Sequence, residues 1–381
     1  MKRILILTSQ SLANDQRILR QIHWLKDDYA VTTLSAGPSR IPGVRNHVLA
    51  YRQKSPLQKI ARGVYYKLGF FEKNYWDLID FQGIAAQVGN ADFDLIIAND
   101  YETLPLAARM ARSAKILFDA HEYAPGHFDN SLYWRFLFKA SSRYICRKYI
   151  PLCHAMTTVT AGLARLYQRE FNIKPIVITN AADYCACAPS PVDKDKIRII
   201  THGNAHPFRK IELMIASMDF ADERFHLDLM LMPTDPKYLA RLKKMALSRS
   251  NVRIIDPVPS AQIISFANAY DLAFLVFQPI TINYKYGLGN KYFECIQSRL
   301  GIITGPFPQP QAELTAEHHC GIVLPEYAPR SIGRRISALD AAQIAAFKAN
   351  AHKAAAALSS RWNADILKQL VADMLDGRTP R

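Results

Sequence analysis

Cysteine is scarce in this sequence, and no apolar run is long. The six cysteines in 381 residues form no CxxC pair and no Cys/His pattern with zinc-ligand spacing, so we expect free thiols in a reducing compartment. No apolar run approaches the roughly 18 residues of a membrane-spanning helix. The first apolar run, which follows Lys2 and Arg3, is short and lacks a cleavage site, so it predicts a strand and not a secretory signal. These absences predict a cytoplasmic protein.

Acidic residues are also few, because 33 Asp and Glu stand against 48 Lys and Arg and leave a net charge of +15. Such a charge predicts an acidic partner, which is a nucleic acid, an anionic membrane or a phosphorylated substrate. No nucleic-acid-binding motif and no aromatic-rich basic loop is present, so we do not expect a nucleic acid. No internal repeat is found, which argues against a solenoid. The length exceeds that of a single core and predicts two domains.

Short aliphatic runs alternate with amphipathic stretches, a pattern typical of parallel βαβ units. The predicted strands of the first half are Ile4–Thr8, Ala30–Ser35, Leu95–Ala98, Lys115–Asp119, Ala155–Val159 and Pro175–Thr179. The alternation restarts in the second half with Ile197–Thr201, Leu227–Leu231, Val252–Ile255, Leu272–Phe277, Gly301–Thr304 and Gly321–Leu324. The stretch from Asp340 to Leu375 is rich in Ala, Lys and Leu and predicts a helix.

The fold class predicted from this pattern is α/β, with two Rossmann-like doubly wound domains that face each other across a cleft. Small residues, prolines and alternating charges interrupt the pattern and mark a linker. The predicted boundaries are 1–182 for the first domain, 183–196 for the linker and 197–355 for the second domain. A C-terminal helix in 356–381 is expected to pack back on the first domain.

One segment, residues 286–294 (YGLGNKYFE), combines two glycines with a helix that opens at Asn290. The glycines allow close approach of a ligand, and the first amides of the helix favour an anion. Lys291 and Glu294 lie in the first turn, where a carboxylate can accept the two hydroxyls of a ribose. The alternative is ordinary capping with Asn290 as the N-cap.

Two further groups are candidates for a binding or catalytic role. The segment 203–210 (GNAHPFRK) follows a predicted strand, and Arg209 and Lys210 at a helix start could clamp a diphosphate. The alternative is a pair of solvated basic residues. His121 follows another predicted strand in the segment DAHEY, at the strand end where α/β proteins bind ligands. The alternative for His121 is a structural histidine with satisfied hydrogen bonds.

Together these segments resemble the family 4 retaining glycosyltransferases, which have the GT-B fold. YGLGNKYFE resembles the E-x7-E signature of that family, and GNAHPFRK its strand–Gly–loop–Arg/Lys motif. Further landmarks occur in the family's order and extend the resemblance over nearly the whole chain: a D-x-R start (Asp15, Arg17), DAHEY, VTAGLARLY at 159–167 and ITNAADY at 178–184.

The resemblance implies a role for each candidate residue. Glu294 would hold the donor ribose, and Arg209 and Lys210, with Gly203 and Lys291 nearby, would bind the diphosphate. The other expected donor-binding residues are Asn204, Tyr286 and Asn290. His121 would face the donor sugar where the bond breaks. The first domain would bind the acceptor, with Asp15 and Arg17 in a loop near donor or acceptor, and the second domain would bind the donor.

The implied reaction is transfer of a sugar from a nucleoside-diphosphate sugar to a glycan or lipid-linked glycan, in surface polysaccharide or glycolipid synthesis, with retention. No His and Asp residues cluster at a metal-ligand spacing, so we expect no metal and no other cofactor. Cations aimed at the leaving diphosphate would stabilise its growing negative charge.

Three departures from the family pattern leave alternatives open. Tyr286 stands where the signature has its first Glu, Asn204 stands where many members carry an Arg, and the loop 9–15 lacks a double glycine. A nucleotide-sugar epimerase of the same architecture and a catalytically silent nucleotide-sugar-binding relative are therefore alternatives. An exported solute receptor is not favoured, because no signal peptide is present.

The positive charge gathers in two stretches of the first domain, Arg52–Lys73 and Arg135–Lys148. The first combines six basic residues with one acid and an apolar helical pattern after Ser55-Pro56. The second has Arg135, Lys139, Arg143 and Arg147 at a spacing of four, interleaved with aromatic residues. Both predict binding to an anionic membrane surface, on the inner face of the membrane. The alternative is an ordinary solvated basic face.

Overall fold

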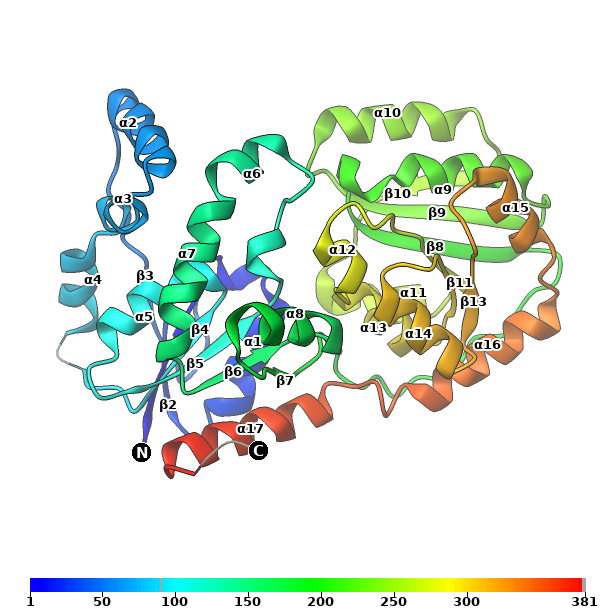
Figure 1. Cartoon of the computed structure of the whole chain (residues 1–381). Coiled ribbons are helices and arrows are strands. Elements are labelled where there is room, and N and C mark those ends of the chain that lie inside the picture. The colour runs from blue at the N-terminus through cyan, green and yellow to red at the C-terminus, as the bar shows by residue number, and fades with distance from the viewer. Residues whose placement is uncertain (90, 379–381) are drawn as a thin grey trace. The chain divides into compact units, whose positions relative to one another are not determined.

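The computed structural model describes residues 1–89 and 91–378, and it divides the chain into two compact units (Figure 1). The first unit comprises Met1–Ile178, Thr281–Asn283 and Ala364–Arg381, and the second comprises Thr179–Ile280 and Tyr284–Asn363. The segment predicted as a linker, 183–196, therefore belongs to the second unit. None of the helices in the described ranges combines the length and apolarity needed to cross a membrane.

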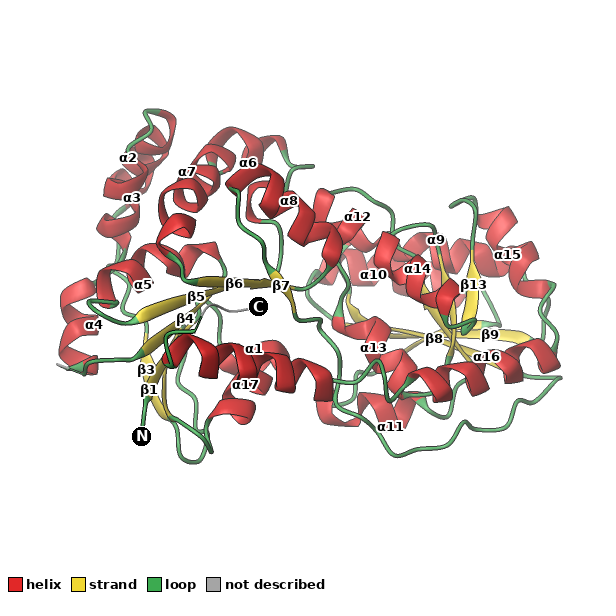
Figure 2. Ribbon diagram, turned by 60° about the horizontal axis from the view of Figure 1, so that its bottom comes forward, coloured by secondary structure: helices red, strands yellow, loops and turns green. Residues whose placement is uncertain are grey.

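The first unit is a seven-stranded parallel sheet of order β3-β2-β1-β4-β5-β6-β7. Figure 2 shows α1 and α17 on one face of this sheet and α7 and α8 on the other. The strands are β1 (Arg3–Leu7), β2 (Ala30–Ser35), β3 (Arg45–Val48), β4 (Leu95–Asn99), β5 (Lys115–Ala120), β6 (Ala155–Thr158) and β7 (Ile176–Val177). The helices are α1 (Gln16–Leu25), α2 (Pro56–Lys67), α3 (Phe71–Leu78), α4 (Phe81–Val88), α5 (Leu104–Met110), α6 (Leu132–Leu137), α7 (Lys139–Tyr149), α8 (Ala161–Phe171) and α17 (Arg361–Leu375).

Burial on both faces explains why the central strands are continuous apolar runs. Every residue of β4 is buried, as a parallel sheet covered by helices requires. On one face, Ile4, Leu95 and Leu117 of the sheet pack with Ile18 of α1 and Val371 of α17. The C-terminal helix therefore completes the core of the first unit.

The second unit is a six-stranded parallel sheet of order β10-β9-β8-β11-β12-β13. Its strands are β8 (Ile197–Asn204), β9 (Phe225–Met232), β10 (Val252–Ile255), β11 (Leu272–Leu275), β12 (Gly301–Thr304) and β13 (Gly321–Val323). Its helices are α9 (Ile211–Ser217), α10 (Pro236–Leu247), α11 (Ile263–Ala267), α13 (Asn290–Gln297), α14 (Gln309–Glu317), α15 (Pro329–Ser337) and α16 (Ala341–Ala354), and α12 (Ile282–Tyr286) begins in the first unit. Alternate residues of its strands enter two separate apolar clusters, one on each face.

The predicted α/β fold class, with two doubly wound parallel sheets, is confirmed, and each predicted strand corresponds to an observed one. The strand β3 was not predicted. Its residues, RNHV, are exposed or half-buried at the sheet edge, so the sequence carries no apolar run there. Edge strands of this kind are held by backbone pairing to one neighbour, here β2.

The stretch from Asp340 to Leu375 was predicted as helical and proves to be two helices. Asp340 caps α16 in a capping box with Gln343, and the helix ends at Ala354. A turn follows before α17, in which the amide of Ser360 donates to the carbonyl of Ala182 at 2.8 Å. The chain leaves the second unit just beyond this turn, at Asn363. Helix propensity alone does not reveal such a crossing, because every residue there is compatible with a helix.

The connection between β3 and β4 carries three helices, α2, α3 and α4, beyond what a βαβ crossover needs. Helix α2 begins where predicted, at Pro56, with Ser55 and Gln58 forming a capping box. Helices α2 and α3 contact each other, and α2 also contacts α6. This insertion lines a cavity that is described below.

Candidate functional site: two ligand-binding edges

In the second unit the predicted donor residues gather at the point where the strand order reverses. Strand β8 lies between β9 and β11, so the connections that leave β8 and its neighbours diverge at the carboxyl ends of these strands. Ligands of open α/β sheets bind at this point. The loop after β8 carries Gly203 to Lys210, and the helix α13 begins near the same edge.

Gly203 brings two cations together. Its φ of +117° is open to glycine and strained for other residues. A Cβ at this position would lie 2.5 Å from Lys291 Nζ and 2.8 Å from Arg209 Nη1. Both charged groups therefore converge on the bare backbone of one residue. Two like charges held this close repel each other unless an anion lies between or beside them.

Helix α13 begins at Asn290, and its N-cap is Gly289, which offers no side-chain hydrogen bond. The alternative in which Asn290 is the N-cap is therefore wrong. The first-turn amides of α13 receive no side-chain cap and are available to an anion. Asn290 Oδ1 is buried and is among the polar atoms of the described chain that lack a hydrogen-bond partner. A buried hydrogen-bond acceptor of this kind suits a ligand that carries a hydrogen-bond donor.

Glu294 lies one turn into α13 and is oriented by a histidine that the sequence reasoning did not select. His202 Nε2 lies 2.9 Å from Glu294 Oε2. Burial and the nearby Arg209 guanidinium lower the pKa of His202 to about 4, so at neutral pH the ring is uncharged and donates its Nε2–H to the carboxylate. His202 directly precedes Gly203 within the strand β8, and its place next to the segment GNAHPFRK was the available signal.

The remaining predicted donor residues lie on the same loops with fewer contacts to this cluster. Asn204 is exposed at the end of β8, and Lys210 is exposed at the N-cap of α9 with a φ of 50°. Tyr286 ends α12, and Lys285 Nζ lies 5.2 Å from the centre of its ring. Arg209 is half-buried, and burial lowers its pKa.

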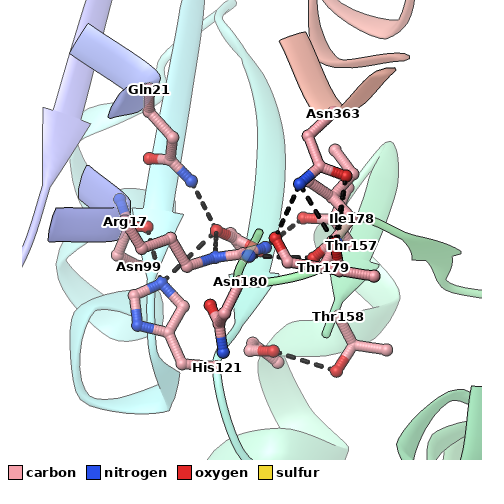
Figure 3. Close-up of polar contacts among 12 residues, drawn as sticks. Arg17, Gln21, Asn99, His121, Thr157, Thr158, Ile178, Thr179, Asn180 and Asn363 are labelled. Atoms are coloured by element: carbon pink, nitrogen blue, oxygen red, sulfur yellow. Dashed lines mark hydrogen bonds and ion pairs between the residues drawn. The ribbon is translucent and has the colours of Figure 1, made fainter. Parts of the chain in front are cut away.

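In the first unit, His121 lies at the carboxyl edge of the sheet, just beyond β5, among the polar side chains of Arg17, Gln21 and Asn99 (Figure 3). Its Nε2 lies 3.1 Å from Asn99 Oδ1 and 3.3 Å from Asp119 Oδ2. Its Nδ1 lies 3.4 Å from Asp100 Oδ2, and its backbone amide donates to Asp100 Oδ1 at 3.2 Å. The ring is therefore held on both nitrogens.

The charges of this network fix its protonation. Burial lowers the pKa of His121, but the carboxylates of Asp100 and Asp119 outweigh it and raise the pKa to about 9. Burial also acts to raise the pKa of Asp119, and Arg17 and His121 hold it well below its usual range instead. At neutral pH the site thus contains an imidazolium ring, a guanidinium and their carboxylate partners.

Arg17 acts on this site through Asp119. Its Nε donates to Asp119 Oδ2 at 2.8 Å and its Nη2 to Asp119 Oδ1 at 2.6 Å, while Nη1 donates to the carbonyl of Ile178 at 2.8 Å. Asp15 caps α1 by accepting from the amides of Arg17 and Ile18, both at 3.1 Å. The D-x-R start therefore places a buried guanidinium beneath His121, and the expected contact of Asp15 and Arg17 with a ligand stays a prediction.

Asp100 contributes a feature that spacing does not reveal. It follows β4 with a φ of +62° and a ψ of 159°, a conformation that non-glycine residues rarely adopt. Its amide donates to the carbonyl of Asp119 at 3.0 Å. Strained residues persist where the surroundings hold them, and they cluster at functional sites. This strain aims the Asp100 carboxylate at His121.

A search of the described residues for three or more His, Cys, Asp or Glu side chains able to hold a metal ion finds no such group. The expectation that basic residues replace a metal stays a prediction. The residues that could neutralise a diphosphate are Arg209 and Lys291, with the first amides of α13.

Comparison with solved structures defines the fold class as GT-B. Over 99% of this chain and 100% of the other, the structure superposes on the sucrose-phosphate synthase from Thermosynechococcus elongatus with a TM-score of 0.74 at 12% identity. HepE of Anabaena, solved in complex with UDP and glucose, gives 0.69 at 15% identity over 99% and 100% of the two chains. WaaG, a glycosyltransferase involved in lipopolysaccharide biosynthesis, gives 0.64 at 13% identity over 98% and 100%.

Sequence comparison adds a family match over part of the chain. Residues 30–184 match the model of Glycosyltransferase Family 4, and this range spans most of the first unit. No curated protein sequence matches significantly. Residues 30–184 are therefore similar to Glycosyltransferase Family 4, and this match, together with the GT-B fold, identifies the chain as a glycosyltransferase.

Proposed function

We propose that this glycosyltransferase transfers a sugar from a nucleoside-diphosphate sugar to a glycan or lipid-linked glycan in the synthesis of a surface polysaccharide or glycolipid, with retention at the anomeric carbon. The observation that supports the donor class is the convergence of Arg209 and Lys291 on Gly203. Two cations at one point of bare backbone suit the diphosphate of such a donor. The structures of HepE with UDP and with UDP-glucose make uracil the first base to test.

The leaving group explains why these cations would accelerate the reaction. As the glycosidic bond breaks, the sugar becomes oxocarbenium-like and the diphosphate gains negative charge. Arg209, Lys291 and the uncapped amides of α13 would bind the diphosphate more strongly in the transition state than in the ground state. Glu294, oriented by His202, would accept the ribose hydroxyls.

His121 would lie beside the donor sugar. The imidazolium and Arg17 are balanced by Asp100 and Asp119, so the network adds no net positive charge near an oxocarbenium-like centre. The Asp100 and Asp119 carboxylates hold the imidazolium ring of His121 in one orientation. A side chain that positions a hydroxyl of the donor sugar needs such a fixed orientation.

The donor assignment is tested by a thermal-shift screen with UDP, GDP, ADP and CMP and their sugar conjugates. A ligand that binds only the folded state at 100 times its Kd adds about 2.7 kcal/mol of stability, so one nucleotide should raise Tm clearly. Lys291→Ala should reduce this shift, whereas Lys243→Ala, an equal charge change on an exposed face of α10, should leave it intact. Equal shifts in wild type and Lys291→Ala would remove the assigned diphosphate site.

We further propose that the first unit binds the anionic inner face of a membrane through α2, α3, α6 and α7. Arg135, Lys139, Arg143, Arg147 and Lys148 line one shallow groove with Phe71 and Tyr144. On α6 next to this groove, Leu132, Tyr133 and Phe136 are 73%, 69% and 69% exposed. Lys67 of α2 lies 4.8 Å above the ring of Phe136, which joins the two basic stretches into one surface. Exposed aromatic and basic side chains together suit an anionic lipid interface.

Vesicle co-sedimentation tests this surface. The double variant Arg135→Glu and Lys139→Glu should lose binding to vesicles of phosphatidylcholine with phosphatidylglycerol. Arg334→Glu with Arg335→Glu, the same charge change on exposed residues of α15, should retain it. Retention by the first double variant, or equal binding to vesicles of phosphatidylcholine alone, would contradict the assignment.

A further inference from the structure

The first unit contains a cavity of about 170 Å³ that none of the predicted site residues lines. It lies at the carboxyl ends of the strands, because Ser9 follows β1, Leu49 follows β3 and Tyr101 to Thr103 follow β4. This is the edge at which open α/β sheets bind ligands. The helices α2, α3 and α7 supply its other walls, with Arg62, Phe71 and Ile145 among the lining residues.

Six of the residues that line the cavity are aromatic, and they come from five different segments. They are Tyr51, Tyr66, Phe71, Tyr75, Tyr101 and Phe138. Aromatic faces carry partial negative charge and pack well against C–H groups that are slightly positive. Pockets for drug-sized ligands are usually about 300–1,000 Å³, so a cavity of this size suits one ring-sized group.

A few polar groups face the same cavity and are fixed by their own contacts. Tyr75 donates its hydroxyl to the backbone carbonyl of Glu102 at 2.9 Å, which holds the turn that presents the Glu102 side chain. Arg62 Nε donates to Asn74 Oδ1 at 2.7 Å, and Asn74 Nδ2 donates back to the carbonyl of Arg62 at 3.2 Å. The guanidinium of Arg62 and the turn that carries Glu102 thus keep fixed positions among the aromatic rings.

The chemistry of Glu102 suits recognition of hydroxyl groups. Burial, followed by the charge of Asp100, raises the pKa of Glu102 to about 8, and Tyr101 hydrogen-bonds its side chain. Around neutral pH the carboxyl is therefore mostly protonated, with one O–H donor and one carbonyl acceptor. A sugar hydroxyl can pair with both. An apolar wall with few polar groups is the usual composition of a small-molecule site.

We propose that this cavity binds the terminal pyranose ring of the acceptor, with the aromatic rings against its C–H faces and Glu102 and Arg62 hydrogen-bonded to its hydroxyls. This inference rests on the proposed function, since it names the acceptor's subsite for that reaction. Phe71 lines both this cavity and the basic groove proposed to meet the membrane. A lipid-linked glycan would therefore find its sugar pocket directly beside the lipid surface.

The test uses saturation-transfer difference NMR on the full chain with the methyl glycosides of glucose, galactose, mannose and N-acetylglucosamine. At least one should bind wild type. Tyr51→Ala, at a residue that is 43% exposed, should weaken that binding about 10-fold or more without unfolding the protein. Glu102→Leu should do the same, whereas Glu102→Gln should retain most of the binding because an amide keeps a donor and an acceptor.

A matched control variant and a separate nucleotide measurement distinguish failure of the sugar pocket from failure of the proposed donor site. Tyr184→Ala removes a tyrosine that is 52% exposed and outside the cavity, and it should bind the sugars as wild type does. The nucleotide thermal shift, measured on the same samples, tests the donor assignment independently. No binding of any glycoside to wild type, or equal binding to wild type and Tyr51→Ala, would overturn the pocket. Sugar binding that depends on Tyr51 without any nucleotide shift would support the pocket and overturn the proposed function.

Discussion

Replacing Gly203 with alanine should disable the anion site without removing any charged group. The backbone at Gly203 has a φ of +117°, and an added Cβ would lie 2.5 Å from Lys291 Nζ and 2.8 Å from Arg209 Nη1. Both cations must move away from their point of convergence. The substitution therefore tests whether the positions of the two cations matter, because both charges remain in the protein.

Two magnitudes follow for Gly203→Ala. Backbone strain in this region costs about 1–3 kcal/mol, which for a unit of this size lowers Tm by roughly 2–10 °C. A hydrogen bond to a charged group contributes about 1.5–3 kcal/mol, so displacing one cation should weaken diphosphate binding at least about 10-fold, and displacing both about 100-fold.

Inorganic pyrophosphate is the appropriate probe, because it tests the site without a choice of nucleoside base. Its Kd would be measured by calorimetry for wild type and for Gly203→Ala at a temperature where both are folded. Gly43→Ala is the control, since Gly43 also has a positive φ, +79°, but no atom lies within 4 Å of its added Cβ. The control should lose stability and keep wild-type affinity. Wild-type affinity for pyrophosphate in Gly203→Ala would show that Arg209 and Lys291 do not form an anion site at Gly203.

Three further outcomes follow from the same contacts. Glu294→Ala and Lys210→Ala should each leave the protein folded and raise the KM for the donor, by about 10-fold for Glu294→Ala. Wild-type kinetics in both variants would remove these residues from the site. Arg17→Ala leaves Asp119 buried without its fork of hydrogen bonds and should cost about 3–5 kcal/mol in urea unfolding, so a cost below about 1 kcal/mol would contradict the described pairing. The pKa of His121 is raised to about 9 in the folded state, so protonated His121 should contribute its full stabilisation of the fold below about pH 6.5 and lose it as the pH rises to 9. The free energy of unfolding should therefore fall by up to about 1.4 kcal/mol per pH unit in this range. His121→Asn should abolish this slope. An unchanged slope in His121→Asn would refute this assignment.

The positions of the central strands along the chain were predictable, because a strand that is buried on both faces is an apolar run in the sequence. The edge strand β3 was not predictable, because its sequence, RNHV, pairs with β2 through backbone hydrogen bonds, and these do not depend on the identity of the side chains. The break between α16 and α17 was missed for a similar reason. It depends on tertiary contacts, such as the one between Ser360 and Ala182, and not on a local helix breaker.

The donor-binding segments could be found from spacing, because glycines before a helix start have a specific physical use. The convergence of Arg209 and Lys291 could not, since Lys291 lies far along the chain from Gly203 and only the folded sheet brings them together. His202 and Glu102 were missed because neither belongs to a spacing pattern with a specific chemical use, and only the folded chain shows what each contacts.

The proposed reaction would be tested by an assay that follows a labelled sugar from its nucleotide to a lipid extract, prepared from cells that make the surface glycan. UDP-, GDP- and ADP-sugars would be offered in turn to wild type and to Glu294→Ala. One donor should yield labelled lipid and free nucleoside diphosphate with wild type, and much less of both with Glu294→Ala. Well-folded wild-type protein that releases no nucleotide and labels no acceptor with any donor, or a Glu294→Ala variant as active as wild type, would contradict the proposed reaction.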